Sequence, residues 1–343
     1  MSRLAAGAAS GRTPAAACGS TAPEPPRLNV VCPSCRQALA LQDSTLYCVA
    51  CGAAYGQRDG VWQLALGRLG APGYDPHHFD SLPQVEDRHF WFLARRALIL
   101  DVLRMSVPDL SERPMFDLGC GSGGLAAYLA GHGVRLSGAS DAYPEALQMA
   151  RRKVDAPLFL VDEGRLPPLG PGQAMIGLFD VLEHIDDDVA TLSWIAEVLE
   201  PGGCLVLTVP AHPALYNDSD RSAHHRRRYR KRELQGKLVA AGLRVRRLTH
   251  FMAPLAPLIL AANWGQAALR PLLRCRPAAS LGARLRVRTG LNAIMGLVLG
   301  LERRLLSQIS LPFGSSLIAV AERPRRVPSS DEVGERPRPL GRP

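Results

Sequence analysis

The chain has 343 residues, of which 47% are hydrophobic and 21% are charged. This length allows one large domain with attachments or two domains, and the apolar content excludes a chain that is disordered throughout. The excess of ten positive charges favours an anionic partner, such as RNA or a phospholipid surface.

The eight cysteines indicate a reducing compartment, because four of them form two C-x-x-C pairs and the others are scattered. No apolar run reaches the roughly 18 residues that cross a membrane, and the N-terminus lacks the apolar region of a secretory signal. We therefore expect a cytoplasmic protein, and peripheral contact with the inner face of the membrane stays open.

Both ends of the chain have compositions that do not support a packed core. Residues 1–27 consist largely of Ala, Gly, Ser, Thr and Pro, and residues 323–343 are rich in Pro and Arg. Such segments bury too little apolar surface to offset the entropy lost on ordering. We predict a disordered leader and a disordered tail.

Residues 28–66 contain Cys32-x-x-Cys35 and Cys48-x-x-Cys51, with twelve residues between the pairs. Four thiolates fill the tetrahedral shell of a structural zinc ion, and a redox role is less favoured because no strand–helix context surrounds the pairs. This segment resembles the small zinc-ribbon proteins that partner or precede methyltransferases. The resemblance includes Tyr55 and the pair Asp59-Gly60 before an apolar strand.

An aromatic helical segment, 74–106, precedes an alternation of strands and helices. Its HFWFLARR sequence could cover a ligand pocket with Phe90, Trp91 and Phe92, although core packing explains these aromatics equally well. Short apolar runs followed by turn signals then predict seven strands. These are 115–118, 134–139, 158–161, 175–179, 204–209, 243–248 and 317–321. Helical segments at 124–130, 144–153 and 189–199 make the sheet mostly parallel, with ligands beyond the carboxyl ends of its strands.

The sequence FDLGCGSGG lies between the first of these strands and a helix. Its glycines allow a tight turn and a close approach of a ligand to the backbone, and they also satisfy the dinucleotide pattern. Asp117, however, would repel a pyrophosphate and suits a cationic amino group. Asp141, after the next strand, suits ribose hydroxyls. Two acids around a glycine turn indicate a cationic nucleoside.

From Met115 to Glu322 the chain resembles the class I S-adenosylmethionine-dependent methyltransferases. The resemblance rests on FDLGCGSGG, SGASDAYPEAL, VDEGRLP, FDVLEHIDD and LEPGGCLVLTVPA. It implies that S-adenosylmethionine contacts Asp117, Gly119, Gly121 and Gly123 at its methionine end, Asp141 and Ala142 at its ribose, and Asp162 and Glu163 at its adenine edge. In one departure, GAS precedes Asp141 where the family has a shorter G-x-Asp, which makes Ser140 an alternative pocket residue.

The resemblance implies a Rossmann-like, seven-stranded class I methyltransferase sheet in a domain spanning 74–322. A zinc ribbon precedes this domain, and a helical insertion, 251–311, precedes its last strand. The two apolar runs of the insertion are too short to span a bilayer. Flanking arginines (Arg270, Arg274, Arg276, Arg303 and Arg304) suit a membrane interface or the roof of an apolar acceptor pocket. Packing on the sheet or a dimer contact is the alternative.

The candidate catalytic residues follow the fourth and fifth strands. His184 titrates near neutrality, although it can equally be a helix-start residue beside the Asp186–Asp188 cap. Asp220, His225 and Tyr229 show a D-x4-H-x3-Y spacing that resembles a subgroup of these enzymes, which makes His225 and Tyr229 candidates too. Six Arg and Lys residues between 226 and 232 suit phosphate, or else form a solvated helix start.

We therefore predict methyl transfer from S-adenosylmethionine to a small or lipid-linked acceptor, because of the apolar insertion and a VLEH motif that resembles quinone-biosynthesis methyltransferases. One alternative is a methyltransferase acting on ribosomal RNA bases, favoured by the net charge, the arginines and the zinc ribbon. Another is a non-catalytic binding protein on the same fold, against which the intact glycines and acids argue. The sequence indicates no oligomeric state.

Overall fold

The computed structural model describes residues 28–67, 85–163, 165, 167–269, 289–306 and 308–325, without the side chains of 266–269. The predicted leader, the first part of the aromatic segment and the arginines at 270, 274 and 276 lie outside the described residues. The prediction of a tail that begins at 323 needs a small correction. Arg323 donates hydrogen bonds to the carbonyls of Glu197 and Leu199, so order extends past the last strand.

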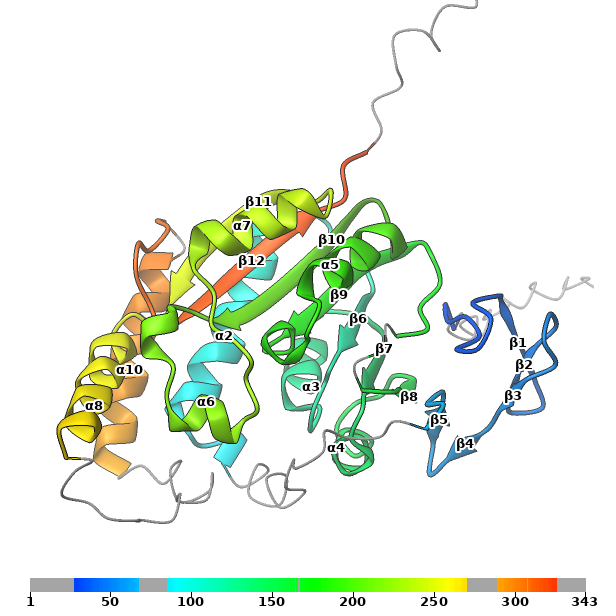
Figure 1. The fold of residues 1–343 in the computed structure, drawn as a ribbon, viewed down its shortest axis with the longest axis horizontal. Helices are drawn as coiled ribbons and strands as arrows, with labels where there is room; N and C mark the ends of the chain where they lie inside the picture. Colours follow the sequence, from blue (N-terminus) through cyan, green and yellow to red (C-terminus); the bar gives the residue numbers. More distant parts are fainter. Residues whose placement is uncertain are drawn as a thin grey trace, which may run out of the picture.

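A single large sheet forms the centre of the fold (Figure 1). All seven predicted strands are present, and in spatial order they are β11 (Arg244–Phe251), β12 (Ser316–Glu322), β10 (Leu199–Pro210), β9 (Gln173–Phe179), β6 (Met115–Leu118), β7 (Leu136–Asp141) and β8 (Leu158–Leu160). Of these seven, β12 alone runs antiparallel to its neighbours. The carboxyl ends of the others therefore share one edge.

The sheet has nine strands, not the seven expected. Strand β5 (Val61–Gln63) pairs in parallel with β8, and β4 (Gln57–Arg58) pairs with β5 through a turn at Asp59-Gly60. Both turn residues have positive φ, 52° and 75°, as a two-residue hairpin turn requires. Residues 28–66, hereafter the cysteine module, thus extend the central sheet with their last two strands.

Helices cover both faces of this sheet (Figure 1). On one face lie α2 (Phe90–Ser106), α3 (Gly124–Gly131) and α10 (Thr289–Leu306), and the apolar side chains of these helices share a core with β6, β10 and β12. On the opposite face lie α5 (Asp188–Val198) and α7 (Lys231–Ala240). The central strands are buried on both sides, as expected of parallel strands between helical layers.

The rest of the cysteine module is a small antiparallel sheet of β1 (Leu39–Gln42), β2 (Thr45–Cys48) and β3 (Ala54–Tyr55). Its first residues also bind the large sheet. The N–H of Val31 donates to the carbonyl of Pro168 at 2.8 Å, and the side chain of Gln173 donates to the carbonyl of Asn29 at 3.1 Å. The module and the sheet are therefore continuous.

The insertion before β12 contains α8 (Leu255–Leu269) and α10, which lie at the end of the molecule opposite the cysteine module (Figure 1). Asn292 of α10 accepts the N–H of Phe90 at 2.9 Å and donates to the carbonyl of Arg88 at 2.8 Å. These bonds fix α10 to the start of α2. Among the described residues, no helix combines the length and apolarity of a membrane span.

Candidate functional site

The glycine loop, residues 119–123, joins β6 to α3, with Gly119, Gly121 and Gly123 all at positive φ. A Cβ at Gly123 would lie 2.8 Å from the Cα of Ala150, whereas a Cβ at Gly121 would meet no atom within 4 Å. Gly123 is therefore required for the loop to pack against α4 (Pro144–Ala150). Gly121 faces open space, where a ligand can approach the backbone.

A β-bulge in β7 accommodates the extra residue that precedes Asp141. The pairing of β7 with β6 steps from Leu136 to Gly138 and leaves Ser137 without a partner residue. Because the bulge lies early in the strand, Asp141 remains its last residue. The longer sequence thus does not displace Asp141 from the edge that carries the glycine loop.

The side chain of Asp141 accepts hydrogen bonds from two backbone segments, the glycine loop and the turn after β7. Its carboxylate accepts the N–H of Gly121 at 2.8 Å and the N–H of Tyr143 at 3.0 Å. Ser140, the alternative pocket residue, is buried, and its carbonyl accepts the N–H of Gly119 at 2.8 Å. Ser140 supports the loop through its backbone, and Ala142 is partly exposed beside Asp141.

Asp117, near the end of β6, is only 2% exposed, and its Oδ1 has no hydrogen-bond partner among the described residues. Burial raises the pKa of Asp117 to about 7, against the opposing effect of Arg95 and with a contribution from Asp141. A buried carboxyl group without a donor is expected to bind one from a ligand. This group lies where the sequence predicted it, beside the glycine loop.

Asp162 and Glu163, the residues predicted at the adenine edge, follow β8. The carboxylate of Asp162 accepts the N–H groups of Leu66 and Gly67 at 2.9 and 3.0 Å, and it pairs with Arg165 at 3.5 Å. Asp162 therefore connects this edge of the site to the end of the cysteine module. Glu163 is partly exposed next to it.

The two predicted histidines come together although they lie on different elements. His184 belongs to the short helix η1 (Leu182–His184) after β9, and His225 lies in the loop after α6 (Asp218–Ser222). Their ring centroids are 4.8 Å apart and nearly perpendicular. Burial, followed by the neighbouring His225, lowers the pKa of His184 to about 4, so His184 is neutral at physiological pH.

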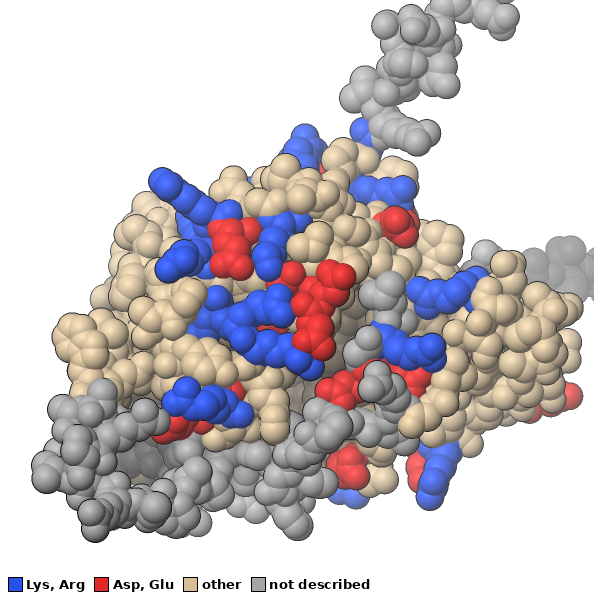
Figure 2. Space-filling model, viewed as in Figure 1, with Lys and Arg blue, Asp and Glu red and all other residues tan. Residues whose placement is uncertain are grey.

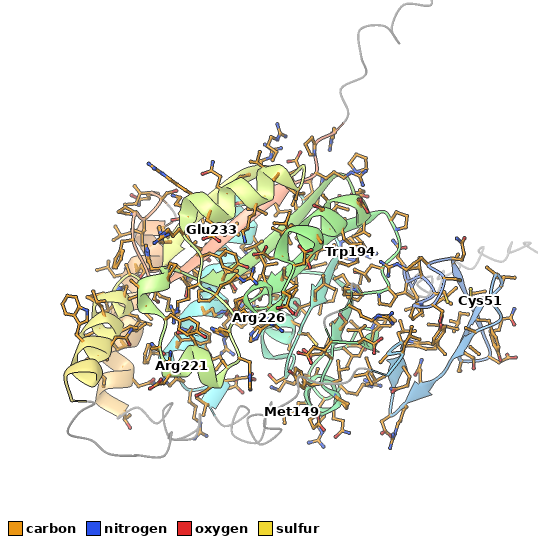
Figure 3. All side chains as sticks on the ribbon, in the orientation of Figure 1. Cys51, Met149, Trp194, Arg221, Arg226 and Glu233 are labelled. Atoms are coloured by element: carbon orange, nitrogen blue, oxygen red, sulfur yellow. The ribbon has the colours of Figure 1, made fainter. Side chains whose placement is uncertain are left out.

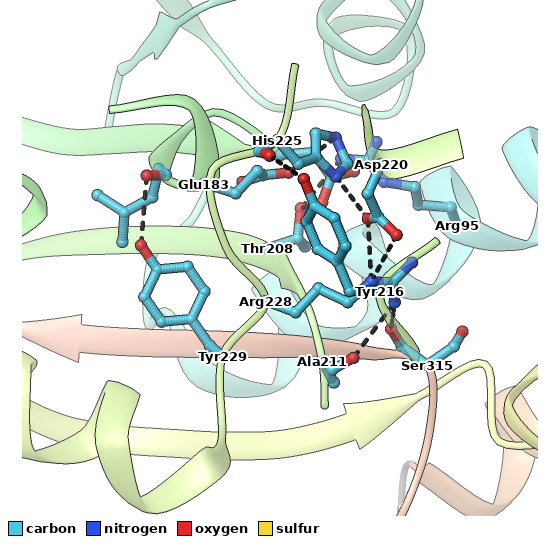
Figure 4. Close-up of polar contacts among 12 residues, drawn as sticks. Arg95, Glu183, Thr208, Ala211, Tyr216, Asp220, His225, Arg228, Tyr229 and Ser315 are labelled. Atoms are coloured by element: carbon cyan, nitrogen blue, oxygen red, sulfur yellow. Dashed lines mark hydrogen bonds and ion pairs between the residues drawn. The ribbon is translucent and has the colours of Figure 1, made fainter. Parts of the chain in front are cut away.

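Asp220 orients His225 (Figure 4). Its Oδ1 lies 2.8 Å from Nδ1 of His225, and both of its oxygens accept from Nε of Arg228, at 2.9 and 3.0 Å. Burial alone would raise the pKa of Asp220, but the bonds to His225 and Arg228 lower it. The carboxylate is charged, and it holds the imidazole in one orientation.

Glu183 lies inside the VLEH motif, but no sequence pattern distinguishes it as a site residue. Glu183 is completely buried, and Oε1 lies 3.9 Å from Nε2 of His225. Burial, followed by the charge of Asp180, raises the pKa of Glu183 well above the usual range. The sequence also does not predict a role for Arg95, because the aromatic residues of the HFWFLARR segment are its most distinctive feature. Arg95 is buried and bridges Asp180 and Thr208.

Tyr229 does not fit the predicted catalytic role. Its side chain is fully buried, and its hydroxyl lies 2.8 Å from Oδ2 of Asp188 and 3.3 Å from the carbonyl of Leu182. The backbone of Tyr229 pairs with Ala211 at the end of β10, which directs the ring into the core. A hydroxyl committed to buried partners is not available to a substrate, so Tyr229 has a structural role.

The first three arginines after His225 are ion-paired within the protein. Arg226 contacts Asp186, Arg227 pairs with Asp188 at 3.1 Å and Arg228 with Asp220. Figure 2 shows basic and acidic side chains adjoining on this face, where Figure 3 places Arg226. These three arginines therefore form a neutralised network and not an open phosphate-binding surface.

The four cysteines of the C-x-x-C pairs form a second group, in the cysteine module, where Figure 3 labels Cys51. Their sulfur atoms all lie within 4.8 Å of one another. The two turns are alike, because Arg36 and Gly52, the residues that follow each pair, both adopt positive φ. Tyr55 places its hydroxyl 3.2 Å from the sulfur of Cys32. This arrangement fits a tetrahedral ion held by four thiolates.

Comparison with known families identifies the central part of the chain. Residues 90–248 match a family model described as a methyltransferase domain. A curated relative, a ubiquinone biosynthesis O-methyltransferase of Xylella fastidiosa (strain 9a5c), is 32% identical over 116 residues, which are 32% of this chain and 46% of the relative. The chain thus spans about half the length of the curated relative that it matches.

Solved structures show similarity over a larger part of the chain. A complex between the Trm112 methyltransferase activator of Haloferax volcanii and a putative methyltransferase contains a chain that is 22% identical, with a TM-score of 0.47. The match covers 75% of this chain and 99% of that one. A putative methyltransferase of Bacillus halodurans is 16% identical, with a TM-score of 0.42, and the match covers 66% and 98% of the two chains.

Proposed function

We propose that the protein transfers a methyl group from S-adenosylmethionine to a hydroxyl oxygen of a small or lipid-linked acceptor, because residues 90–248 match a methyltransferase domain. The observation that carries this proposal is the glycine loop flanked by two buried acids, Asp117 and Asp141. The curated relative is an O-methyltransferase, which supports an oxygen acceptor.

The residues at this edge fit S-adenosylmethionine. Asp117 offers an unpartnered carboxylate oxygen to the ammonium group of the methionine part, and Gly121 leaves the backbone open to a ligand. Asp141 and Ala142 would contact the ribose, and Asp162 and Glu163 would border the adenine. Bound S-adenosylmethionine would supply an electrophilic sulfonium methyl group.

On the acceptor side, the protein must align a nucleophilic oxygen and stabilise it as its proton leaves. The imidazoles of His184, after β9, and His225, in the loop after α6, lie together on the same edge of the sheet as the glycine loop. Asp220 fixes the orientation of His225, so that the imidazole needs little reorganisation when an acceptor binds.

An apolar surface on α10 favours an acceptor held at a membrane. Five exposed apolar side chains follow one another at three- and four-residue intervals along this helix: Leu291, Ile294, Val298, Leu301 and Leu305. Leu258 and Trp264 of α8 are exposed too. Arg303, in the last turn of α10, contacts Asp101, so the exposed apolar side chains of the two helices would carry a peripheral contact with a membrane.

We further infer that the cysteine module is a zinc ribbon with one structural ion bound by Cys32, Cys35, Cys48 and Cys51. The ion would stabilise a module that has few core residues of its own, because binding energy becomes folding energy when a site forms only on folding. An RNA acceptor is less favoured, since three of the six basic residues between 226 and 232, Arg226, Arg227 and Arg228, are paired with acids.

Incubation of the protein with radiolabelled S-adenosylmethionine and either membrane lipid extract or total RNA tests this function. We expect label in the lipid fraction and heat of binding for S-adenosylmethionine but not for NAD. Label in RNA alone would transfer the proposal to RNA. Absence of S-adenosylmethionine binding would leave the non-catalytic alternative.

Binding to anionic phospholipid vesicles tests the membrane contact. Leu301→Glu on α10 should weaken binding at high salt, because it removes the inserted apolar side chain. Leu41→Glu serves as the matched control, since Leu41 is similarly exposed but lies in the cysteine module. Equal effects of the two variants would contradict the contact.

A further inference from the structure

Glu183 carries a buried carboxyl group for which the described residues supply no hydrogen bond. Its side chain is completely buried, and neither carboxylate oxygen has a hydrogen-bond partner among the described residues. A buried acid without a partner is strongly unfavourable, and native proteins satisfy such groups with a donor, a water or an ion. The surroundings of Glu183 should therefore show which of these it binds.

Two imidazoles surround this carboxylate. One ligand atom each from Glu183, His184 and His225 lies within 4.8 Å of the others. Among the described residues, the cysteine cluster is the only other group of this kind. A first-row divalent ion binds imidazole and carboxylate atoms at about 2.0–2.2 Å, so that small side-chain rotations bring three atoms at these separations onto one ion.

The surrounding residues resemble the outer shell of a metal site. The charged carboxylate of Asp220 accepts a hydrogen bond from Nδ1 of His225, which leaves Nε2 with a lone pair facing Glu183. Metal-bound histidines commonly donate their other ring N–H to a carboxylate in this way. Arg228 in turn holds Asp220.

The chain also holds the two segments of this group together. The N–H of Arg226 donates to the carbonyl of Glu183 at 2.9 Å, and its guanidinium donates to the carbonyl of His184 at 2.7 Å. The loop that carries His225 is therefore bonded directly to the turn that carries the other two residues. Such a fixed arrangement is expected of a site that binds one ion.

We propose that Glu183, His184 and His225 bind one divalent transition-metal ion at the acceptor side of the site. One carboxylate and two imidazoles favour manganese, cobalt or zinc over magnesium and calcium, which prefer oxygen ligands. Three protein ligands leave coordination positions at which oxygen atoms of the acceptor can bind. This role in acceptor binding rests on the proposed function. The ion would lower the pKa of a bound hydroxyl, which bare imidazoles would otherwise have to deprotonate.

Titration of the full-length protein with Mn²⁺, followed by electron paramagnetic resonance, tests the site. Mn²⁺ is the suitable probe because the thiolate cluster of the cysteine module prefers softer ions. We expect one bound Mn²⁺ per chain in the wild type. Glu183→Gln and His225→Ala should abolish binding, and Asp220→Asn should weaken it by about 10–100-fold through loss of the outer-shell bond.

His224→Ala is the matched control, since it removes an adjacent, exposed histidine and should retain the bound ion. Absence of Mn²⁺ binding by the wild type would overturn the proposal, and so would binding that survives both Glu183→Gln and His225→Ala. Mn²⁺ binding by the wild type tests the existence of the site even if one variant fails to fold. Because no S-adenosylmethionine is present, the result is independent of whether the protein transfers methyl groups.

Discussion

Nη2 of Arg95 lies 2.6 Å from Oδ2 of Asp180, so that an ion pair between the buried Arg95 and the half-buried Asp180 joins α2 to the end of β9. The same nitrogen donates to the hydroxyl of Thr208 at 3.0 Å, and that hydroxyl donates to Asp180 at 3.0 Å. Asp180 has a φ of 57°, which a residue with a side chain adopts only when its surroundings hold it. The pair thus fixes the turn that leads to Glu183 and His184.

Replacement of Arg95 by alanine should strongly destabilise the fold. It leaves Asp180 without its cation and removes the opposite charge that lowers the pKa of Asp117. We expect the free energy of unfolding to fall by about 1.5–3 kcal/mol, because hydrogen bonds to a charged group are lost while Asp180 keeps partial contact with solvent. Arg96→Ala is the control in urea denaturation, since its partner Asp87 is largely exposed and the pair is worth about 0–1 kcal/mol. Equal losses would contradict the role of Arg95.

The affinity for S-adenosylmethionine should depend on the ionisation of Asp117. Its pKa of about 7 in the free protein means that the carboxyl group becomes protonated as the pH falls through neutrality. Because the ammonium group binds the ionised form, the dissociation constant should rise by up to about tenfold per pH unit below 7. Calorimetry between pH 5.5 and 8 measures this. Asp117→Asn should bind S-adenosylmethionine weakly, with little dependence on pH. If the affinity of this variant still varies with pH as in the wild type, another group causes the dependence.

Tyr229→Phe should reduce stability without changing methyl transfer. The variant removes one hydrogen bond to Asp188, which keeps its ion pairs with Arg227 and Lys237. We expect a loss of about 0.5–1.5 kcal/mol in the free energy of unfolding. Thermal denaturation and the rate of methyl transfer from S-adenosylmethionine would be measured side by side. A large fall in rate with unchanged stability would restore a catalytic Tyr229.

Cys48→Ser should remove the zinc ion and lower the melting temperature. The variant breaks the four-thiolate shell of the cysteine module, whose folding depends on the ion. Elemental analysis of purified protein should find one zinc per chain fewer in the variant than in the wild type. Cys204→Ser provides the comparison, because Cys204 is a buried free thiol outside the cluster. A zinc content that is unchanged by Cys48→Ser would show that the four cysteines do not hold the ion.

The sequence predicts the seven central strands well because each is a short apolar run between turn signals. It does not predict that β5 extends the sheet. Val61–Gln63 is only three residues long, and its partner Leu158–Leu160 lies far along the chain. Local patterns report which residues are apolar, but the pairing of a short strand such as β5 depends on the assembled domain.

In the candidate site, too, local sequence patterns predict some residues, whereas others depend on tertiary packing. The spacing of Asp117, Asp141 and the glycines is local to strand ends, so that sequence patterns locate them. Glu183 and Tyr229 depend on packing instead. The missing partner of Glu183 becomes visible only in the folded structure. The direction of the Tyr229 ring likewise depends on a tertiary contact, the bridge between Ala211 and Tyr229.

The pairing of β5 with β8 has a consequence for synthesis on the ribosome. The cysteine module emerges before the central strands and already contains all four sulfur atoms, so it can take up the proposed ion while those strands are still being made. Strand β5, however, must wait until β6, β7 and β8 have been translated, since its neighbour in the sheet is β8. At roughly 5–20 residues per second, the intervening chain takes several seconds to appear. During that interval Val61 and Trp62, both buried in the finished protein, are open to chaperones.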